Sequence, residues 1–216
     1  MNTPEATLSQ NEKYLDEKLN IKEKQYFFEL EKLITQKIKK RPLSLLDIGC
    51  ATGDFLSFLD ARKAFEASLN GIDVFPELLA QAASKLPHAT FMQASVLDLP
   101  ECLENSFDVI TASGVMTLFS LDQLPAFFAN IRRCLRENGL AVVFSPFNKY
   151  GVNVHVNHMV ASEGGVSPQW ETGYNCFSFQ TIEEIVSPLF RSSDFLPFSL
   201  QSPDQPQFQS DLQLDH

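Results

Sequence analysis

Residues 45–56 read LLDIGCATGDFL, which is an apolar run, a turn between two glycines and the start of a second apolar segment. The run that follows Pro42 is typical of a short, buried parallel strand, and the residues from Asp54 onward are typical of a helix. Gly49 and Gly53 allow backbone angles and a close ligand approach that a Cβ atom would prevent. Because helix N-termini attract anions, the turn predicts a site for a carboxylate or phosphate. A strand–turn–helix corner without a ligand is the alternative.

The alternation of strands and helices continues through residues 42–146. Further strands are predicted near residues 69–74, 90–94, 107–112 and 140–145, and helices near residues 54–65, 77–85 and 122–137. The last of these helices is expected to stop at Asn138-Gly139. This pattern predicts an α/β fold, a doubly wound and mostly parallel sheet with helices on both faces. In such sheets, ligands bind beyond the carboxyl ends of the strands.

The flanking segments have different patterns. Residues 1–41 are predicted to be a polar tail followed, from Glu12, by one long helix or two shorter ones. Residues 147–200 are expected to complete the same domain with a loop, a helix near residues 181–189 and a last strand near residues 195–200. The loop, residues 146–179, is rich in aromatic residues and histidine, and we interpret it as a cap over the site; a surface insertion is the alternative. Residues 201–216 are predicted to be a flexible tail.

Charge and composition limit the possible functions. The 216-residue chain carries a formal charge of −10, and residues 42–216 alone hold eight Lys/Arg against twenty Asp/Glu, a balance of −12. An acidic body repels a phosphate backbone, so DNA and RNA are not expected as partners. No apolar run reaches the length of about 20 residues that crosses a bilayer, and the first ten residues do not resemble a secretory signal. We therefore expect a cytoplasmic protein with four free cysteines and no metal.

Two aspartates flank the glycine turn. Asp47 precedes Gly49, and Asp73 ends the second predicted strand, where a carboxylate can accept hydrogen bonds from both hydroxyls of a ribose. The spacing of Gly49 and Gly53 lacks the G-x-G-x-x-G pattern of dinucleotide sites, which disfavours a nicotinamide dehydrogenase. Asp47 favours a ligand that carries an ammonium group. The residues thus predict a nucleoside joined to an amino acid.

Five short motifs, in this order, resemble the class I S-adenosylmethionine-dependent methyltransferases. They are DIGCATG at residues 47–53, GID at 71–73, VLDLP at 96–100, FDVI at 107–110 and RENGL at 136–140. The resemblance implies a Rossmann-like fold and transfer of a methyl group to an O, N or C atom of a small molecule. It implies S-adenosyl-L-methionine as cofactor and S-adenosyl-L-homocysteine as product.

The resemblance also implies roles for single residues. The backbone around Gly49 and Gly53 would hold the methionine part of the cofactor, with Asp47 near its amino group. Asp73 would bind the ribose hydroxyls.

The remaining cofactor contacts implied by the resemblance come from the next strand ends. Val74 and Val96 would enclose the adenine, and Ser95 would meet its edge. Ala112 and Ser113 would contact the amino acid part. Ser95 departs from the family pattern, which often has an acidic residue at this position.

The predicted cap supplies candidates for catalysis and substrate binding. His155 and His158 have side chains that can accept a proton near neutral pH. Tyr150, Trp170 and Tyr174 are candidates for an aromatic substrate wall. The chain after residue 200 is too short and polar for the last antiparallel strand that the family usually has. A non-catalytic methyltransferase-like domain that binds the cofactor or a protein is therefore the alternative function.

Overall fold

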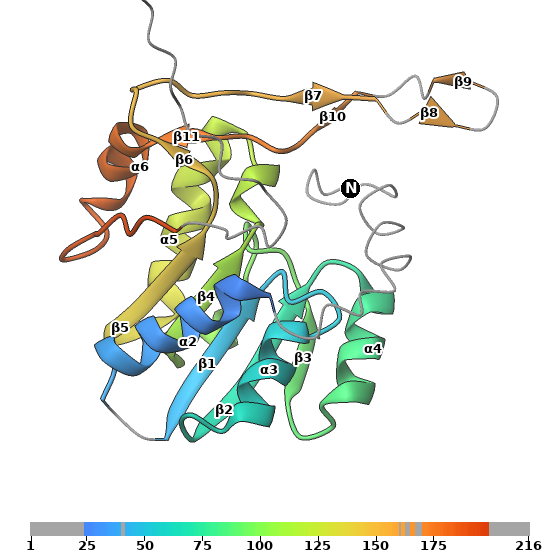
Figure 1. The fold of residues 1–216 in the computed structure, drawn as a ribbon, viewed down its shortest axis with the longest axis vertical. Helices are drawn as coiled ribbons and strands as arrows, with labels where there is room; N and C mark the ends of the chain where they lie inside the picture. Colours follow the sequence, from blue (N-terminus) through green and yellow to red (C-terminus); the bar gives the residue numbers. More distant parts are fainter. Residues whose placement is uncertain (1–23, 40–41, 160, 163–164, 167–169, 199–216) are drawn as a thin grey trace, which may run out of the picture.

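The computed structural model describes residues 24–39, 42–159, 161–162, 165–166 and 170–198. Its centre is a five-stranded sheet of order β3-β2-β1-β4-β5, in which every neighbouring pair is parallel (Figure 1). The strands are β1 (Leu43–Ile48), β2 (Ala67–Asp73), β3 (Thr90–Gln93), β4 (Phe107–Ser113) and β5 (Leu135–Phe144). The strand order reverses between β1 and β4, which is where sheets of this kind bind ligands. The predicted α/β class and the five-strand alternation are confirmed.

Helices cover both faces of the sheet. One face packs against α2 (Gln25–Lys37), α3 (Asp54–Arg62) and α4 (Pro76–Lys85), and the other against α5 (Leu124–Cys134) and α6 (Phe179–Val186). In α2, the buried side chains Phe27, Leu30 and Ile34 recur three and four residues apart, so a single stripe of the helix meets the sheet. Its predicted extension back to Glu12 lies outside the described residues. None of the helices described here has the length and apolar character of a membrane span.

The boundary between α5 and β5 differs from the prediction. The helix ends at Cys134 rather than near Asn138-Gly139, because the buried Leu135 already pairs with Phe107 on β4. The next pair is Val109 with Leu140, so residues 136–139 bulge out of the ladder. Asn138 has a φ of +61° within this bulge. The Asn-Gly pair therefore shapes a bulge and does not end the helix.

Beyond β5 the chain forms an arm, which we define as the described residues between 149 and 176. It contains β7 (Asn157–His158), β8 (Ala161–Ser162), β9 (Gly165–Val166) and β10 (Glu171–Thr172), in two antiparallel pairs. The arm leaves the body beside β6 (Phe147–Asn148) and returns through β11 (Phe177–Ser178), which pairs with β6 in parallel. Figure 1 shows the arm projecting past the helices and the sheet. The predicted aromatic loop is thus an extended ribbon.

The described chain after α6 does not add a strand to the sheet. The predicted strand near residues 195–200 is wrong for residues 195–198, which are irregular, and its last two residues lie outside the described range. This segment instead contacts both ends of β5. Arg191 donates hydrogen bonds to Glu137 and Asn138 near the start of that strand, and Phe198 packs against Phe144 at its end, with ring centroids 5.3 Å apart. Pro197 lacks the N–H that a ladder would need. The predicted tail at residues 201–216 also lies outside the described range.

Candidate cofactor and active site

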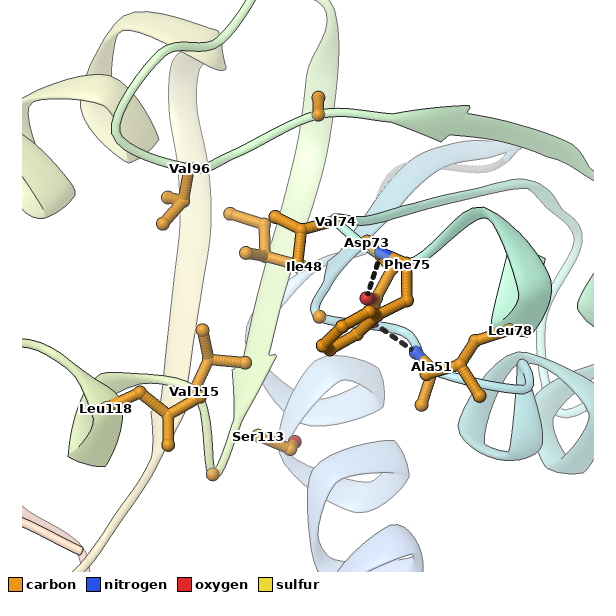
Figure 2. A pocket seen from close by; sticks show the side chains of 13 residues that line it. Ile48, Ala51, Asp73, Val74, Phe75, Leu78, Val96, Ser113, Val115 and Leu118 are labelled. Carbon is orange, nitrogen blue, oxygen red and sulfur yellow. Dashed lines mark hydrogen bonds between the residues drawn. The ribbon is translucent and has the colours of Figure 1, made fainter. Parts of the chain in front are cut away.

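A pocket opens at the carboxyl ends of β1, β2 and β4, where the strand order reverses. It holds about 610 Å³ of space, including solvent at its mouth. Five residues that the sequence singled out line it: Gly49, Asp73, Val74, Val96 and Ser113. Figure 2 shows how the side chains from these strand ends surround the same space.

Asp73 is held in the pocket by the backbone. One carboxylate oxygen accepts a hydrogen bond of 2.9 Å from the N–H of Ala51, and the other accepts one of 3.1 Å from the N–H of Phe75 (Figure 2). A carboxylate has about four acceptor positions, so Asp73 can still accept a hydrogen bond from a ligand. Burial raises the pKa of Asp73 above its usual range, and the hydrogen bonds from Phe75, Ala51 and Val74 partly oppose this. The carboxylate is therefore oriented before any ligand arrives.

The glycine turn brings the backbone close to the opposite wall of the pocket. Gly49 has a φ of +67°, and a Cβ atom on it would lie 2.3 Å from Cγ2 of Val115. Only glycine fits this position, because a side chain would meet both the strained angle and the wall. Gly53 plays a different part: its φ is +74°, and a Cβ atom there would lie 3.0 Å from Cβ of Ala82 on α4. Gly53 permits close packing of the turn on α4 and does not line the pocket.

Asp47 lies just behind the turn and is almost completely buried, with 4% of its surface exposed. Its carboxylate accepts a hydrogen bond of 2.7 Å from the hydroxyl of Thr111 on β4. Burial raises the pKa of Asp47 to about 7; the Thr111 hydrogen bond lowers it, and the nearby charge of Asp73 raises it further. The result is a carboxyl group that changes protonation near neutral pH. Asp47 is not among the residues that line the pocket.

Other predicted residues lie near the pocket without lining it. The side-chain oxygen of Ser95 accepts a hydrogen bond of 3.0 Å from the N–H of Leu97 and so stabilises the turn after β3. Ala112 lies on β4 and is fully buried in the core. Cys50 is also buried, and burial raises the pKa of its thiol, which favours a role as a small packing residue over one as a nucleophile.

The candidates from the predicted cap are all on the arm. His155, His158, Tyr150, Trp170 and Tyr174 are not among the residues that line the pocket. His155 packs against Phe177 and His158 against Tyr174, with ring centroids 6.3 and 5.6 Å apart. The structure therefore does not bring the two histidines or the three aromatic side chains together with the Asp73 carboxylate.

Sequence reasoning missed most of the apolar wall. The additional lining residues are Ile48, Ala51, Phe75, Leu78, Ala94, Gly114, Val115 and Leu118. One sequence feature could have indicated Val115 and Leu118 as lining residues. They are three residues apart and follow directly after the strand that ends at Ser113. The hydroxyl of Ser113 is buried and has no hydrogen-bond partner within the part of the chain that the structure describes. Such a group points to a ligand that supplies the partner.

Comparison with known proteins agrees with this geometry. Residues 45–139 match the family model described as a methyltransferase domain. The chain is 32% identical over 104 residues to a 2-phytyl-1,4-naphtoquinone methyltransferase of Trichormus variabilis, an alignment that covers 45% of this chain and 44% of that protein. It is 28% identical over 182 residues to a ubiquinone/menaquinone biosynthesis C-methyltransferase of Campylobacter jejuni, covering 74% of this chain and 75% of the relative. The first of these matches thus spans less than half of the relative's length.

Solved structures share the fold. The structure of CalS10 with S-adenosylmethionine bound, an amino pentose methyltransferase from Micromonospora echinaspora, superposes with a TM-score of 0.57 at 16% identity. The superposition covers 85% of this chain and 89% of the other. The strand order, the pocket at the strand-order reversal and the matched family model lead to one assignment. Residues 45–139 match a methyltransferase domain, and the described fold is that of solved S-adenosylmethionine-dependent methyltransferases.

Proposed function

We propose that this protein transfers the methyl group of S-adenosylmethionine to a small, uncharged acceptor. The observation that carries the proposal is the Asp73 carboxylate, fixed by the N–H groups of Ala51 and Phe75 inside a pocket beside the glycine turn. A carboxylate at the end of the second strand is suited to a pair of ribose hydroxyls. The family match over residues 45–139 and the shared fold support the same cofactor.

The residues present fit the cofactor in size and chemistry. The side chains of Val74 and Val96 give two apolar surfaces for a flat base. Gly49 leaves its backbone open to the amino acid part, and the buried hydroxyl of Ser113 offers an unused donor and acceptor within the pocket. Asp47, behind the turn, supplies the negative charge that an ammonium group needs nearby. We propose that Gly53, Ser95 and Ala112 support these groups from outside the pocket.

The chain contributes positioning more than acid–base chemistry. When bound, S-adenosylmethionine supplies a methyl group already activated by a positively charged sulfur. Asp73 is the only ionisable side chain that the pocket lining contains among the described residues. Its hydrogen bonds with the backbone orient the carboxylate for the ribose. The apolar side chains of Leu78, Val115 and Leu118 exclude water from the pocket. Orientation of the cofactor and acceptor, together with exclusion of water, is sufficient to accelerate such a transfer.

The lining also indicates the kind of acceptor. No Lys, Arg or His side chain is among the described residues that line the pocket, so the protein side chains there offer no opposite charge to a carboxylate or phosphate on the acceptor. The formal charge of −10 adds to this preference. One relative is named as a naphthoquinone methyltransferase and another as a C-methyltransferase of ubiquinone and menaquinone biosynthesis, and quinones are apolar and uncharged. We therefore propose an apolar, uncharged acceptor, methylated at an O, N or C atom.

Calorimetry with S-adenosylmethionine tests the cofactor proposal. We expect binding by the unmodified protein and at least a tenfold weaker affinity for Asp73→Ala. Asp60→Asn is the matched control, because Asp60 is a carboxylate on α3 that pairs with His88 outside the pocket. Equal affinities in the Asp73→Ala variant and the unmodified protein would remove Asp73 from the proposed role.

A transfer assay separates the two functions that the sequence allows. Incubation with isotope-labelled S-adenosylmethionine and a panel of quinones, phenols and neutral amines should give S-adenosylhomocysteine in equal amount to the methylated product. Cofactor binding without any product across the panel would favour the non-catalytic domain. The position of the label in the product identifies the methylated atom.

A further inference from the structure

The arm, residues 149–176, carries most of the exposed apolar side chains of the described molecule. Five of the seven large hydrophobic side chains that are exposed in the described part of the chain lie on it: Tyr150, Val152, Val154, Trp170 and Tyr174. Trp170 is 66% exposed and Tyr150 is 76% exposed. Apolar side chains gathered on one projecting element are typical of a contact surface.

Contacts within the arm leave these side chains largely exposed. The β7–β10 pair contains two residue pairs, Glu171 with His158 and Thr172 with Asn157. An isolated two-stranded ribbon is marginally stable in water, and a stable one packs against another element. Figure 1 shows that the outer half of the arm lies beyond the described helices and the central sheet. The missing cover must therefore come from outside the described body.

The base of the arm is firmly attached, so its direction is set by the body. Asn175 is fully buried there. Its N–H donates to the carbonyl of Thr117 at 2.9 Å, and its side-chain amide donates to the carbonyl of Phe119 at 2.8 Å. Its side-chain oxygen accepts from the N–H of Val156 at 2.9 Å. A ribbon anchored in this way presents its exposed side chains in a defined orientation.

The charge of the arm favours some binding partners over others. Residues 149–176 contain Lys149, Glu163 and Glu171, a balance of −1, which leaves −9 on the rest of the chain. Contact through the arms would bring two nearly neutral surfaces together while the acidic bodies stay apart. An anionic nucleic acid or membrane surface would find no excess of positive charge on the arm to attract it.

The strand edges lead to the same kind of partner. Among the described residues, β7 and β10 form a sheet of only two strands, so each strand has an outer edge. An antiparallel pair between a strand and its own copy is related by a two-fold axis, so such an edge is complementary to itself. We propose that the arm is a dimer contact, in which the ribbon and its exposed aromatic side chains pack against the arm of a second copy of this chain. This proposal does not depend on the methyltransferase function.

Trp170 provides a direct test, because it is the only tryptophan in the chain. Light scattering after size-exclusion chromatography should give twice the 24.3 kDa mass at high concentration. Dilution should return the mass of one chain and shift the tryptophan emission to longer wavelength as Trp170 becomes exposed. A mass of one chain at every concentration up to millimolar would overturn the proposal.

Two matched substitutions locate the contact. Val152→Lys should weaken the dimer at least tenfold, because the two-fold axis places like charges near each other. Leu196→Lys is the control: Leu196 is 60% exposed, close to the 54% of Val152, and lies outside the arm. Equal dimer affinity in both variants would overturn the proposal. Trp170→Ser provides a second variant if Val152→Lys does not fold. The Trp170 emission could instead move to shorter wavelength only when phosphatidylcholine vesicles are added, without any dimer. That result would also overturn the proposal and assign the arm to a membrane surface.

Discussion

The hydroxyl of Thr111 donates a 2.7 Å hydrogen bond to the Asp47 carboxylate, which joins the centres of β4 and β1 under the glycine turn. Burial nevertheless dominates and raises the pKa of Asp47 to about 7. The folded chain therefore holds this proton more tightly than the unfolded chain, whose Asp47 has a pKa near 3.8. The stability of the fold falls as the pH rises between these two values, because only the folded state still binds the proton there.

Asp47→Asn should remove this pH dependence. Asparagine stays neutral and can still accept from Thr111, so the variant should be more stable than the unmodified protein at pH 8 by on the order of 3 kcal/mol. The difference should shrink towards zero at about pH 3, where the aspartate is protonated in the folded state and largely so in the unfolded state. Urea unfolding at several pH values measures this. Parallel stability curves for the two proteins would contradict the predicted proton uptake.

Cofactor affinity should depend on pH in the opposite direction to stability. If the ammonium group of S-adenosylmethionine lies near Asp47, binding favours the charged carboxylate and releases its proton. Affinity should then increase as the pH rises from 6 to 8, by several-fold. Calorimetry in two buffers of different ionisation enthalpy measures the proton release directly. Asp47→Asn should bind more weakly and show no proton release, and an unchanged release in that variant would exclude Asp47 as the source.

Gly49→Ala should destabilise the fold through two separable causes. The φ of +67° costs about 1–2 kcal/mol with any side chain, and the overlap with Val115 Cγ2 at 2.3 Å adds a further cost on the order of 1–3 kcal/mol. The double variant Gly49→Ala/Val115→Ala should recover only the second part. Gly114→Ala is the control for the first part, because Gly114 has a φ of +76° and a Cβ atom added to it would have no neighbour within 4 Å among the described residues.

Thermal unfolding of the unmodified protein, the two single variants and the double variant completes this double-mutant cycle. A purely additive result, with no recovery in the double variant, would mean that Val115 moves aside at little cost. The same result would indicate that the pocket wall opposite Gly49 is adaptable.

Arg62→Ala should loosen the attachment of α2 to α3. The Nε of Arg62 donates to both carboxylate oxygens of Glu31, at 2.8 and 3.0 Å, and the guanidinium group lies 4.9 Å from the ring centre of Phe28. Because Glu31 is buried while Arg62 is partly exposed, we expect a loss of about 2 kcal/mol in unfolding free energy. Arg191→Ala is the control, because its pair with Glu137 is exposed on both sides and should contribute little. Equal losses in the two variants would contradict the prediction.

The strand ends were predictable because their signals are local. The glycine turn and Asp73 follow apolar runs in the sequence, and parallel strands bring their carboxyl ends to one edge. Val115 and Phe75 were not predictable as pocket residues, because their place depends on how the chain turns after each strand. The end of α5 was misplaced since the pairing of Leu135 with Phe107 is a contact between distant residues.

The arm was harder to predict for a different reason. Its strands contain two residues each, which is too short for any alternation of polar and apolar side chains to be visible. Its many aromatic residues suggested a role at the ligand, but such side chains are equally suited to protein contacts. The composition therefore marked these residues as unusual without indicating that they lie away from the pocket lining.

Arg191 and Phe198 contact the two ends of β5, the outer strand of the described sheet. These contacts hinder the approach of another chain to that strand. A bare outer strand is a template on which other chains can assemble into fibres. Proteolytic clipping after Leu189 would remove these contacts while leaving α6 in place. The shortened protein should precipitate readily on storage or gentle heating, even though the pocket residues would all be retained.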